Sequence, residues 1–596
     1  MTICRCDCRG SNSADSLAEI RMKMSDAGID VIVISMQNSF GNFVDGPSDV
    51  EFISGFSGSN GKAIISLDRA VLLVDGRYVK QAREQSDSAI WEIKQYPDCD
   101  TISVVAELWT TETTDSFEKV LGMISTSISY GSYISTIDAF RGLPGVSVEL
   151  IEPNFLNRNR KKSETTVFLH DPIHVGESSD ERINRIRADL KDDEVLLFTE
   201  QSMIGWLFGV RLSRATESKS IIPNCVAIIS KSGKPVLFCD LDVIDSSPSL
   251  EIRKLGEFED AVSSTLRSSD IVACDYSTVP AYFISYLQSH GFDTRDSRSK
   301  YSDFFCVKNN TEIKNQRIAA ELTSIAFIET LAFAENESGI TETDVSDFFE
   351  NAAKKLPGFV DLSFNSISAF GENTSIVHYN PKICGNSRIS DIGLFLFDAG
   401  IHFNNSTTDM TRTVFIGEID DLIDWRRIRS IYTTVLKSVI MFSAAKFPVK
   451  VRASAIDSIA RFEVWRSGND YQFGTGHGVG SFGNVHEPPR ISKISTSLMK
   501  QGMVVTVEPG IYEQFFGIRL ENMLLTKNSE SDGFLEFETL NFIPFCRKLI
   551  DRSMLTEFEV SWLSAYYQAI LDRFAEHFKD DAVTSVWLRN NTSDFT

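Results

Sequence analysis

The sequence predicts a chain of α/β and α+β domains, in which two related α/β domains precede a strand-rich domain. Three observations support this fold class. Helical and strand patterns alternate in the first half of the chain, the same order of elements then repeats, and from about Lys308 the pattern changes to strands that end in carboxylates. The predicted domains are residues 1–160, 161–306 and 307–596.

The repeated half is visible in the order of its elements. An amphipathic helical pattern over residues 17–24 precedes an apolar strand pattern over residues 29–34. The same order returns with a helical pattern over residues 183–190 and a strand pattern over residues 194–198. The polar stretch 157–166 is the expected linker between the two α/β domains.

The last part of the chain begins with two predicted helices. Apolar residues at helical spacing run from Arg317 to Glu335, and Thr341 is placed to cap a second helix. Strands that carry polar motifs follow. An amphipathic pattern after Thr556 then predicts a closing helix.

Composition and charge exclude several classes of function. The net charge of −23 argues against nucleic-acid binding, which needs a concentrated basic face. No run approaches the roughly 18 apolar residues of a membrane span, and the first residues lack the apolar region of a secretory signal. Ten scattered cysteines indicate a reducing, cytoplasmic setting. Cys4, Cys6 and Cys8 alternate, but nothing nearby completes a tetrahedral metal set.

Two segments with one shared pattern carry paired carboxylates. Each reads as a glycine, an apolar strand, a carboxylate, a glycine turn, a return strand and a second carboxylate. The first pair is Asp398 and Asp409, and the second is Glu508 and Glu521. Antiparallel strands joined by such a turn would bring each pair close enough to share a metal ion. His477 lies between the two segments in a glycine-rich stretch.

These five side chains are a ligand set for two divalent metal ions. Carboxylates with one imidazole favour hard or borderline ions, so Mn²⁺, Zn²⁺ and Co²⁺ are the candidates. Each acid follows or interrupts an apolar strand, where an uncompensated charge is costly unless it binds something. Paired metal ions indicate hydrolysis.

At these residues the sequence resembles the pita-bread metallopeptidases, most closely the aminopeptidase P group. Weaker similarity covers nearly the whole chain, and the two α/β domains resemble the creatinase-like domains of the long, three-domain form. The shared motifs, in order, are Ile376-Val-His378-Tyr, Phe397-Asp-Ala-Gly400, Thr407-Thr-Asp-Met-Thr-Arg-Thr413, Gly474-Thr-Gly-His-Gly-Val-Gly-Ser481, Asn484-Val-His-Glu487, Val507-Glu-Pro-Gly510 and Ile518-Arg-Leu-Glu-Asn522.

The resemblance implies a role for each predicted metal ligand. Asp398 would bind one ion, Asp409 and Glu521 would bridge both, and His477 and Glu508 would complete the second. Of the three candidate metals, Mn²⁺ is the first expectation. The implied reaction is release of the N-terminal residue from peptides with proline in the second position, by a homodimeric enzyme.

The resemblance also implies three catalytic groups. Glu508 would take a proton from the attacking water, and His378 and His486 would hold the scissile peptide and its developing oxyanion. No such role is expected for the other histidines. These are His170, His174, His290, His402 and His577.

One position departs from the aminopeptidase P pattern, which has a histidine where this chain has Phe473. Phenylalanine can donate neither a hydrogen bond nor a proton. The favoured hypothesis is that the change costs rate and that Phe473→His restores it, since the neighbouring glycines would leave room for either ring. The other is that Phe473 belongs to an apolar wall matched to this protein's own substrates.

Two alternative functions remain open. An Xaa-Pro dipeptidase, or prolidase, has the same fold, although the long N-terminal half favours the aminopeptidase. A non-catalytic peptide-binding module belongs to a different class. Modules of that kind usually lose metal ligands, whereas all five are present here.

Overall fold

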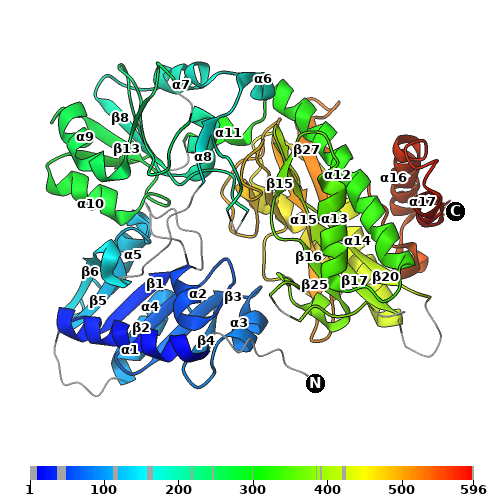
Figure 1. The fold of residues 1–596 in the computed structure, drawn as a ribbon, viewed down its shortest axis with the longest axis horizontal. Coiled ribbons are helices and arrows are strands. Elements are labelled where there is room, and N and C mark those ends of the chain that lie inside the picture. Colours follow the sequence, from blue (N-terminus) through cyan, green and yellow to red (C-terminus); the bar gives the residue numbers. More distant parts are fainter. Residues whose placement is uncertain are drawn as a thin grey trace. The chain divides into compact units, whose positions relative to one another are not determined.

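The computed structural model divides the chain into two compact units (Figure 1). Unit 1 comprises residues 1–170, 178–213 and 222–301, and unit 2 comprises residues 171–177, 214–221 and 302–596. Cys4, Cys6, Cys8 and most of the predicted linker lie outside the described residues. The described residues are 10–36, 48–111, 118–156, 165–216, 219–244, 247–297, 300–383, 385–389, 392–418 and 425–593.

Unit 1 alternates helices and strands. Its helices are α1 (Gly10–Ala27), α2 (Asp49–Ser54), α3 (Val79–Gln85), α4 (Thr101–Thr111), α5 (Tyr130–Phe140), α7 (Ser179–Ala188), α8 (Gln201–Phe208), α9 (Phe258–Thr265) and α10 (Ala281–Ser289). Its strands are β1 (Val31–Ser35), β2 (Lys62–Ser66), β3 (Ala70–Asp75), β4 (Glu92–Tyr96), β5 (Lys119–Ile124), β6 (Val146–Ile151), β7 (Val167–Leu169), β8 (Glu194–Phe198), β9 (Val210–Leu212), β10 (Val226–Ser230), β11 (Val236–Phe238), β12 (Glu251–Arg253), β13 (Ile271–Cys274) and β14 (Asp293–Asp296).

Two six-stranded sheets of unit 1 share one topology. The first has the order β4-β3-β2-β1-β5-β6, and the second has the order β12-β11-β10-β8-β13-β14. In both sheets the two pairings that join the second, third and fourth strands of this order are antiparallel, and the other three are parallel. This correspondence confirms the predicted repeat of two related α/β folds.

Unit 2 holds the strands that carry the polar motifs. Its helices are α6 (Pro172–Val175), α11 (Ser302–Cys306), α12 (Asn310–Asn336), α13 (Glu342–Ala353), α14 (Arg426–Ser443), α15 (Ala453–Arg466), α16 (Glu557–Phe574) and α17 (Ala582–Thr592). Its strands are β15 (Phe359–Leu362), β16 (Ile367–Phe370), β17 (Gly393–Ala399), β18 (Ile401–Phe403), β19 (Ser406–Thr407), β20 (Met410–Ile416), β21 (Lys446–Pro448), β22 (Gly476–Gly478), β23 (Glu487–Ile491), β24 (Val504–Val507), β25 (Gly510–Tyr512), β26 (Gly517–Arg519), β27 (Asn522–Asn528) and β28 (Phe534–Thr539).

Two helix pairs cover the sheets of unit 2. Helix α12 packs with α13, and α14 packs with α15 (Figure 1). The first pair lies near β16 and β19, and the second lies near β23 and β24. The largest sheet has the order β21-β28-β27-β24-β22-β23, and β17 lies between β16 and β20 in a smaller one. Among the described residues no helix has both the length and the apolar character to cross a membrane.

Helices α13 and α16 of unit 2 each begin with a capping box, and the cap at Thr341 confirms the predicted one. Thr341 caps α13 by accepting a hydrogen bond from the backbone N–H of Asp344, and Thr556 caps α16 in the same way through Glu559. In both cases the side chain of the acid accepts a hydrogen bond from the backbone N–H of the threonine. Two N–H groups at the start of each helix therefore have a partner. The predicted helix over residues 317–335 is part of α12.

Buried aromatic rings support the strand that leads to the first carboxylate pair. Phe397 on β17 packs edge-to-face against Phe327 of α12 and Phe349 of α13, with ring centroids 5.0 and 5.4 Å away. Such pairs contribute about 0.5–1.5 kcal/mol each beyond their buried area. Because successive strand residues point to opposite faces, Asp398 projects away from this core.

Candidate metal centre

The two carboxylate pairs occupy equivalent positions in the fold. Asp398 lies on β17 and Asp409 immediately precedes β20, its antiparallel partner strand. Glu508 immediately follows β24 and Glu521 immediately precedes β27, which is antiparallel to β24. Each pair flanks a short hairpin, β18–β19 in the first case and β25–β26 in the second. The predicted pattern of strand, turn and return strand is therefore present twice.

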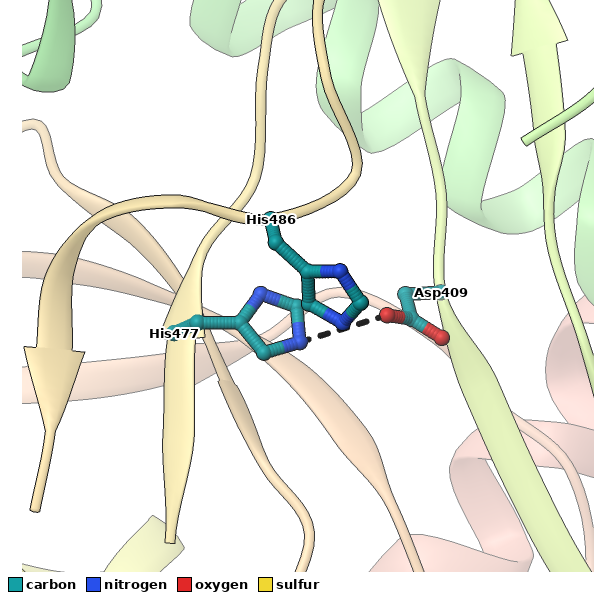
Figure 2. A group of neighbouring side chains, drawn as sticks. All are labelled: Asp409, His477 and His486. Carbon is teal, nitrogen blue, oxygen red and sulfur yellow. Dashed lines mark ion pairs between the residues drawn. The ribbon is translucent and has the colours of Figure 1, made fainter. Parts of the chain in front are cut away.

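The structure brings all five predicted ligands together. One ligand atom of each, together with a ring nitrogen of His486, falls into overlapping groups of three atoms that lie within 4.8 Å of one another. These groups are Asp398, Asp409 and Glu521; His477, Glu508 and Glu521; and Asp409, His477 and His486. Figure 2 shows the third group, in which both imidazole rings point towards the Asp409 carboxylate.

The hydrogen bonds of His477 direct one ring nitrogen into this cluster. Nδ1 lies 3.0 Å from the carbonyl oxygen of Gly478. Nε2 lies 3.3 Å from Oδ2 of Asp409 and 3.5 Å from Oε1 of Glu508. A metal-binding histidine commonly donates from its other nitrogen to a carbonyl, and the Gly478 contact has that geometry.

Two carboxylate oxygens of the cluster have no hydrogen-bond partner among the described residues. They are Oδ1 of Asp398 and Oε1 of Glu521, and both are buried. Burial and the neighbouring carboxylates raise the pKa values of Asp409 and Glu521 well above their ordinary range. A buried acidic cluster with unpaired oxygens is unfavourable by itself and attracts cations. The donor set therefore fits two divalent ions.

Arg519 is a central residue of the site that the sequence analysis did not single out. Its guanidinium forms a buried ion pair with Asp398 and donates a hydrogen bond to the hydroxyl of Tyr512. Burial raises the pKa of that tyrosine to about 12, so it stays neutral. Arg519 also donates to the carbonyl oxygen of Val377, at 3.3 Å. One side chain thus connects a predicted ligand to the segment before His378.

Arg412 holds the backbone beside the other carboxylates. It is fully buried on β20, and it donates to the carbonyl oxygens of Glu521 at 2.6 Å and Ile543 at 2.9 Å. Thr411 reinforces the same contact, because its hydroxyl donates to Oε2 of Glu521 at 2.9 Å. The strand after Asp409 is thereby tied to Glu521.

The two predicted catalytic histidines lie in irregular backbone. His486 is exposed immediately before β23, with its ring centroid 4.3 Å from that of His477. His378 is half-buried in a turn that follows the short 3-10 helix η3 (Gly371–Ser375). The β-branched residues Ile376 and Val377 predict a strand directly before His378, but η3 and this turn occupy that segment.

Phe473 packs against aromatic rings. Its ring centroid lies 5.1 Å from that of Tyr471 and 5.9 Å from that of Tyr512. The neighbouring glycines lie close to other segments of backbone. A Cβ atom would lie 3.0 Å from a carbonyl oxygen at Gly474 and 2.0 Å from one at Gly476. Close approach of neighbouring backbone, and not free space, explains these glycines.

The fold and the donor set together define the chain as a metallopeptidase. Residues 314–528 match metallopeptidase family M24, and residues 533–595 match the C-terminal region of that family. Residues 17–152 match the creatinase/prolidase N-terminal domain. The fold class predicted from the motifs is confirmed.

Similar proteins narrow this assignment. The chain is 31% identical to the "Probable Xaa-Pro aminopeptidase P" of Blastomyces gilchristii, over 98% of this chain and 99% of the relative. It is 32% identical to the protein of that name from Paracoccidioides brasiliensis (strain Pb03), with the same coverage. The chain therefore belongs to the Xaa-Pro aminopeptidase P family of M24 metallopeptidases, as the motifs predicted.

A solved structure has the same fold over the whole chain. It is the X-prolyl aminopeptidase of Caenorhabditis elegans, described as a cytosolic enzyme with a di-nuclear active site. The TM-score is 0.88 at 25% sequence identity, covering 98% of this chain and all of the other.

Proposed function

We propose that this chain is a binuclear-metal aminopeptidase that releases the N-terminal residue from peptides with proline in the second position. The observation that carries the proposal is the convergence of four carboxylates and one imidazole in overlapping groups. The aminopeptidase reading is favoured over the prolidase alternative by the full-length similarity to Xaa-Pro aminopeptidases.

The proposed ligand roles follow the overlaps between these groups. Asp409, His477 and Glu521 each belong to two groups. Of these, the two carboxylates have two oxygens with which to bridge two ions, whereas Nδ1 of His477 faces the Gly478 carbonyl and leaves one nitrogen for a metal. Asp398 belongs to one group and binds one ion, while His477 and Glu508 complete the second. When bound, two divalent ions lower the pKa of water and polarise the peptide carbonyl. Mn²⁺ is the proposed metal, with Zn²⁺ and Co²⁺ as alternatives.

Glu508 is proposed to accept the proton of the attacking water. Its side chain is 21% exposed, against 6% for Asp409. Glu508 therefore has better access to solvent, with which it can exchange a proton. His378 and His486 are proposed to hold the scissile peptide and to donate hydrogen bonds to its oxygen as charge develops there. A proline ring after the scissile bond removes the amide N–H, so the pocket needs no acceptor for it.

The wider arrangement is proposed from the same similarities. The three domains are residues 1–160, 161–306 and 307–596, and the assembly is a homodimer. A cytosolic location is supported by the description of the Caenorhabditis elegans enzyme.

The deciding experiment compares two peptides in the presence of Mn²⁺. An Xaa-Pro-Xaa tripeptide and an Xaa-Pro dipeptide are incubated with the protein, and the products are identified by mass spectrometry. Release of the first residue from the tripeptide is expected, with Asp409→Ala as an inactive control. Cleavage of the dipeptide alone would establish the prolidase alternative. A protein that binds no metal and cleaves neither peptide would be a binding module.

A further inference from the structure

A second buried carboxylate lies outside the candidate metal centre. Glu342 is the first residue of α13 and its side chain is fully buried. Oε1 accepts hydrogen bonds from the backbone N–H of Phe370 at 2.6 Å and from Nδ2 of Asn373 at 2.8 Å. Oε2 accepts from the Tyr379 hydroxyl at 2.7 Å and from the backbone N–H of Ser387 at 2.6 Å.

The donors around Glu342 require an acceptor at both oxygens. Two of them are backbone N–H groups, from Phe370 and Ser387, which can only donate. Burial raises the pKa of Glu342, and the four hydrogen bonds oppose that shift. An ionised carboxylate accepts at both oxygens, and the N-terminal position in α13 favours its negative charge. A glutamine at this position would place its NH₂ group, a donor, against a backbone N–H, which is also a donor, so that one hydrogen bond would be lost.

The segment held by this carboxylate carries His378. Tyr379, the next residue, donates its hydroxyl to Glu342, and the turn closes with the Tyr379 N–H donating to Ile376 at 3.2 Å. On the other side of His378, the carbonyl oxygen of Val377 accepts from Arg519. Both chain neighbours of His378 are therefore tied to buried charged side chains.

We propose that Glu342 is a positioning residue for His378. Its carboxylate fixes Tyr379 and the backbone at both ends of the segment from Phe370 to Ser387, and this sets the position from which His378 reaches the peptide. The inference rests on the proposed function, because His378 acts there on the substrate. Loss of the anchor should lower kcat more than it changes KM, since the contact is made chiefly in the transition state.

The test is a double-mutant cycle between Glu342→Gln and His378→Ala. The single variant Glu342→Gln is expected to lower kcat on an Xaa-Pro-Xaa peptide by up to about 100-fold, the cost of displacing a catalytic group by about 1 Å. In the His378→Ala background the same change should cost less than about twofold. An equal loss in both backgrounds, or no loss in the single variant, would overturn the proposal.

Matched controls separate positioning from general damage. Glu321→Gln makes the same substitution at an exposed glutamate of the adjacent helix α12, and it should leave kcat unchanged. Metal content should be the same in every variant. If Glu342→Gln does not fold, Tyr379→Phe removes only one of the four donors, and its effect on kcat must also vanish in the His378→Ala background.

Hydrogen exchange on the metal-free protein gives a readout that does not depend on activity. Glu342→Gln should speed exchange at residues 376–379 and leave β17 and β20 unchanged. Unchanged exchange in the turn would overturn the anchoring role, whatever the enzyme cleaves. If the wild-type protein instead cleaves neither peptide, the proposed function fails while the exchange experiment still decides the anchor.

Discussion

His477 and Asp409 face each other with 3.3 Å between Nε2 and Oδ2 (Figure 2). With its Nδ1 proton donated to the Gly478 carbonyl, the ring turns the Nε2 lone pair towards the carboxylate. Two groups that both offer electron pairs repel each other unless a proton or a cation lies between them. A divalent ion suits this position best, because the remaining carboxylates supply its other ligands.

The proposed bridging roles predict different metal losses from different substitutions. Asp409→Ala or Glu521→Ala should release both ions, because each of these carboxylates is proposed to bridge them. Asp398→Ala should release about one, since it serves a single ion. Elemental analysis after dialysis measures the content, and Glu530→Ala, an exposed acid, is the control. Two tightly held ions in the Asp409→Ala protein would rule out the bridging assignment.

The two proposed catalytic histidines should affect rate without affecting metal content. His378→Ala and His486→Ala are each expected to lower kcat by about 10² or more, the usual scale for a lost oxyanion or acid–base group. His577→Ala, an exposed histidine, is the control.

The assignment of His486 as a catalytic group can be separated by experiment from a role as a metal ligand. Its ring nitrogen lies in one ligand group with Asp409 and His477. Loss of a metal ion from the His486→Ala protein would show that this residue is a ligand and that its catalytic assignment is wrong.

Much of this arrangement could be predicted from local sequence patterns. The turn between each pair of apolar strands places one carboxylate at either end of a hairpin. The alternation of side chains along a strand then puts the two carboxylates on the same face of the sheet. The capping residues Thr341 and Thr556 are similarly local, because each acts within three positions of the chain.

Other features depend on contacts between distant residues and leave no local signal. Arg519 meets Asp398 across more than a hundred positions, so spacing could not reveal the ion pair. The segment before His378 contains the β-branched residues Ile376 and Val377, which favour a strand. The segment forms a turn instead, in which Val377 accepts a hydrogen bond from Arg519 and Tyr379, after His378, donates one to Glu342.

The acidic cluster predicts a characteristic pH dependence for the metal-free protein. Burial and neighbouring charge raise the pKa values of Asp409 and Glu521 in the folded state. Such groups do not destabilise the protein below their unfolded pKa of about 4, and they destabilise it increasingly as pH rises through the folded values. The double variant Asp409→Asn, Glu521→Gln should therefore gain stability relative to wild type as pH rises. Urea denaturation across this range measures the difference.

Added Mn²⁺ should make the wild-type protein more stable than the double variant at neutral pH. An ion that binds only the folded state stabilises it by about 2.7 kcal/mol at a concentration one hundred times its Kd. Wild type should gain this amount and the double variant should not. A difference between the two proteins that does not change with pH or with Mn²⁺ would contradict the electrostatic account of the cluster.

Phe473→His tests whether the site has adapted to phenylalanine. The ring packs between Tyr471 and Tyr512, and the hydroxyl of Tyr512 accepts a hydrogen bond from Arg519. We expect the substitution to lower the melting temperature and not to raise kcat/KM, because the aromatic contacts are worth about 0.5–1.5 kcal/mol each. A polar imidazole among these rings would also need a hydrogen-bond partner.

The opposite hypothesis is that the family's histidine supplies a hydrogen bond to the peptide. A bond of that kind contributes about 1.5–3 kcal/mol, or roughly ten- to a hundredfold in rate, so Phe473→His would then raise kcat/KM. Phe462→His, at an exposed phenylalanine of α15, controls for the substitution itself. The two hypotheses predict opposite signs for one variant, measured on one Xaa-Pro-Xaa peptide. A gain in kcat/KM with an unchanged melting temperature would show that the aromatic packing around Phe473 is incidental to its function.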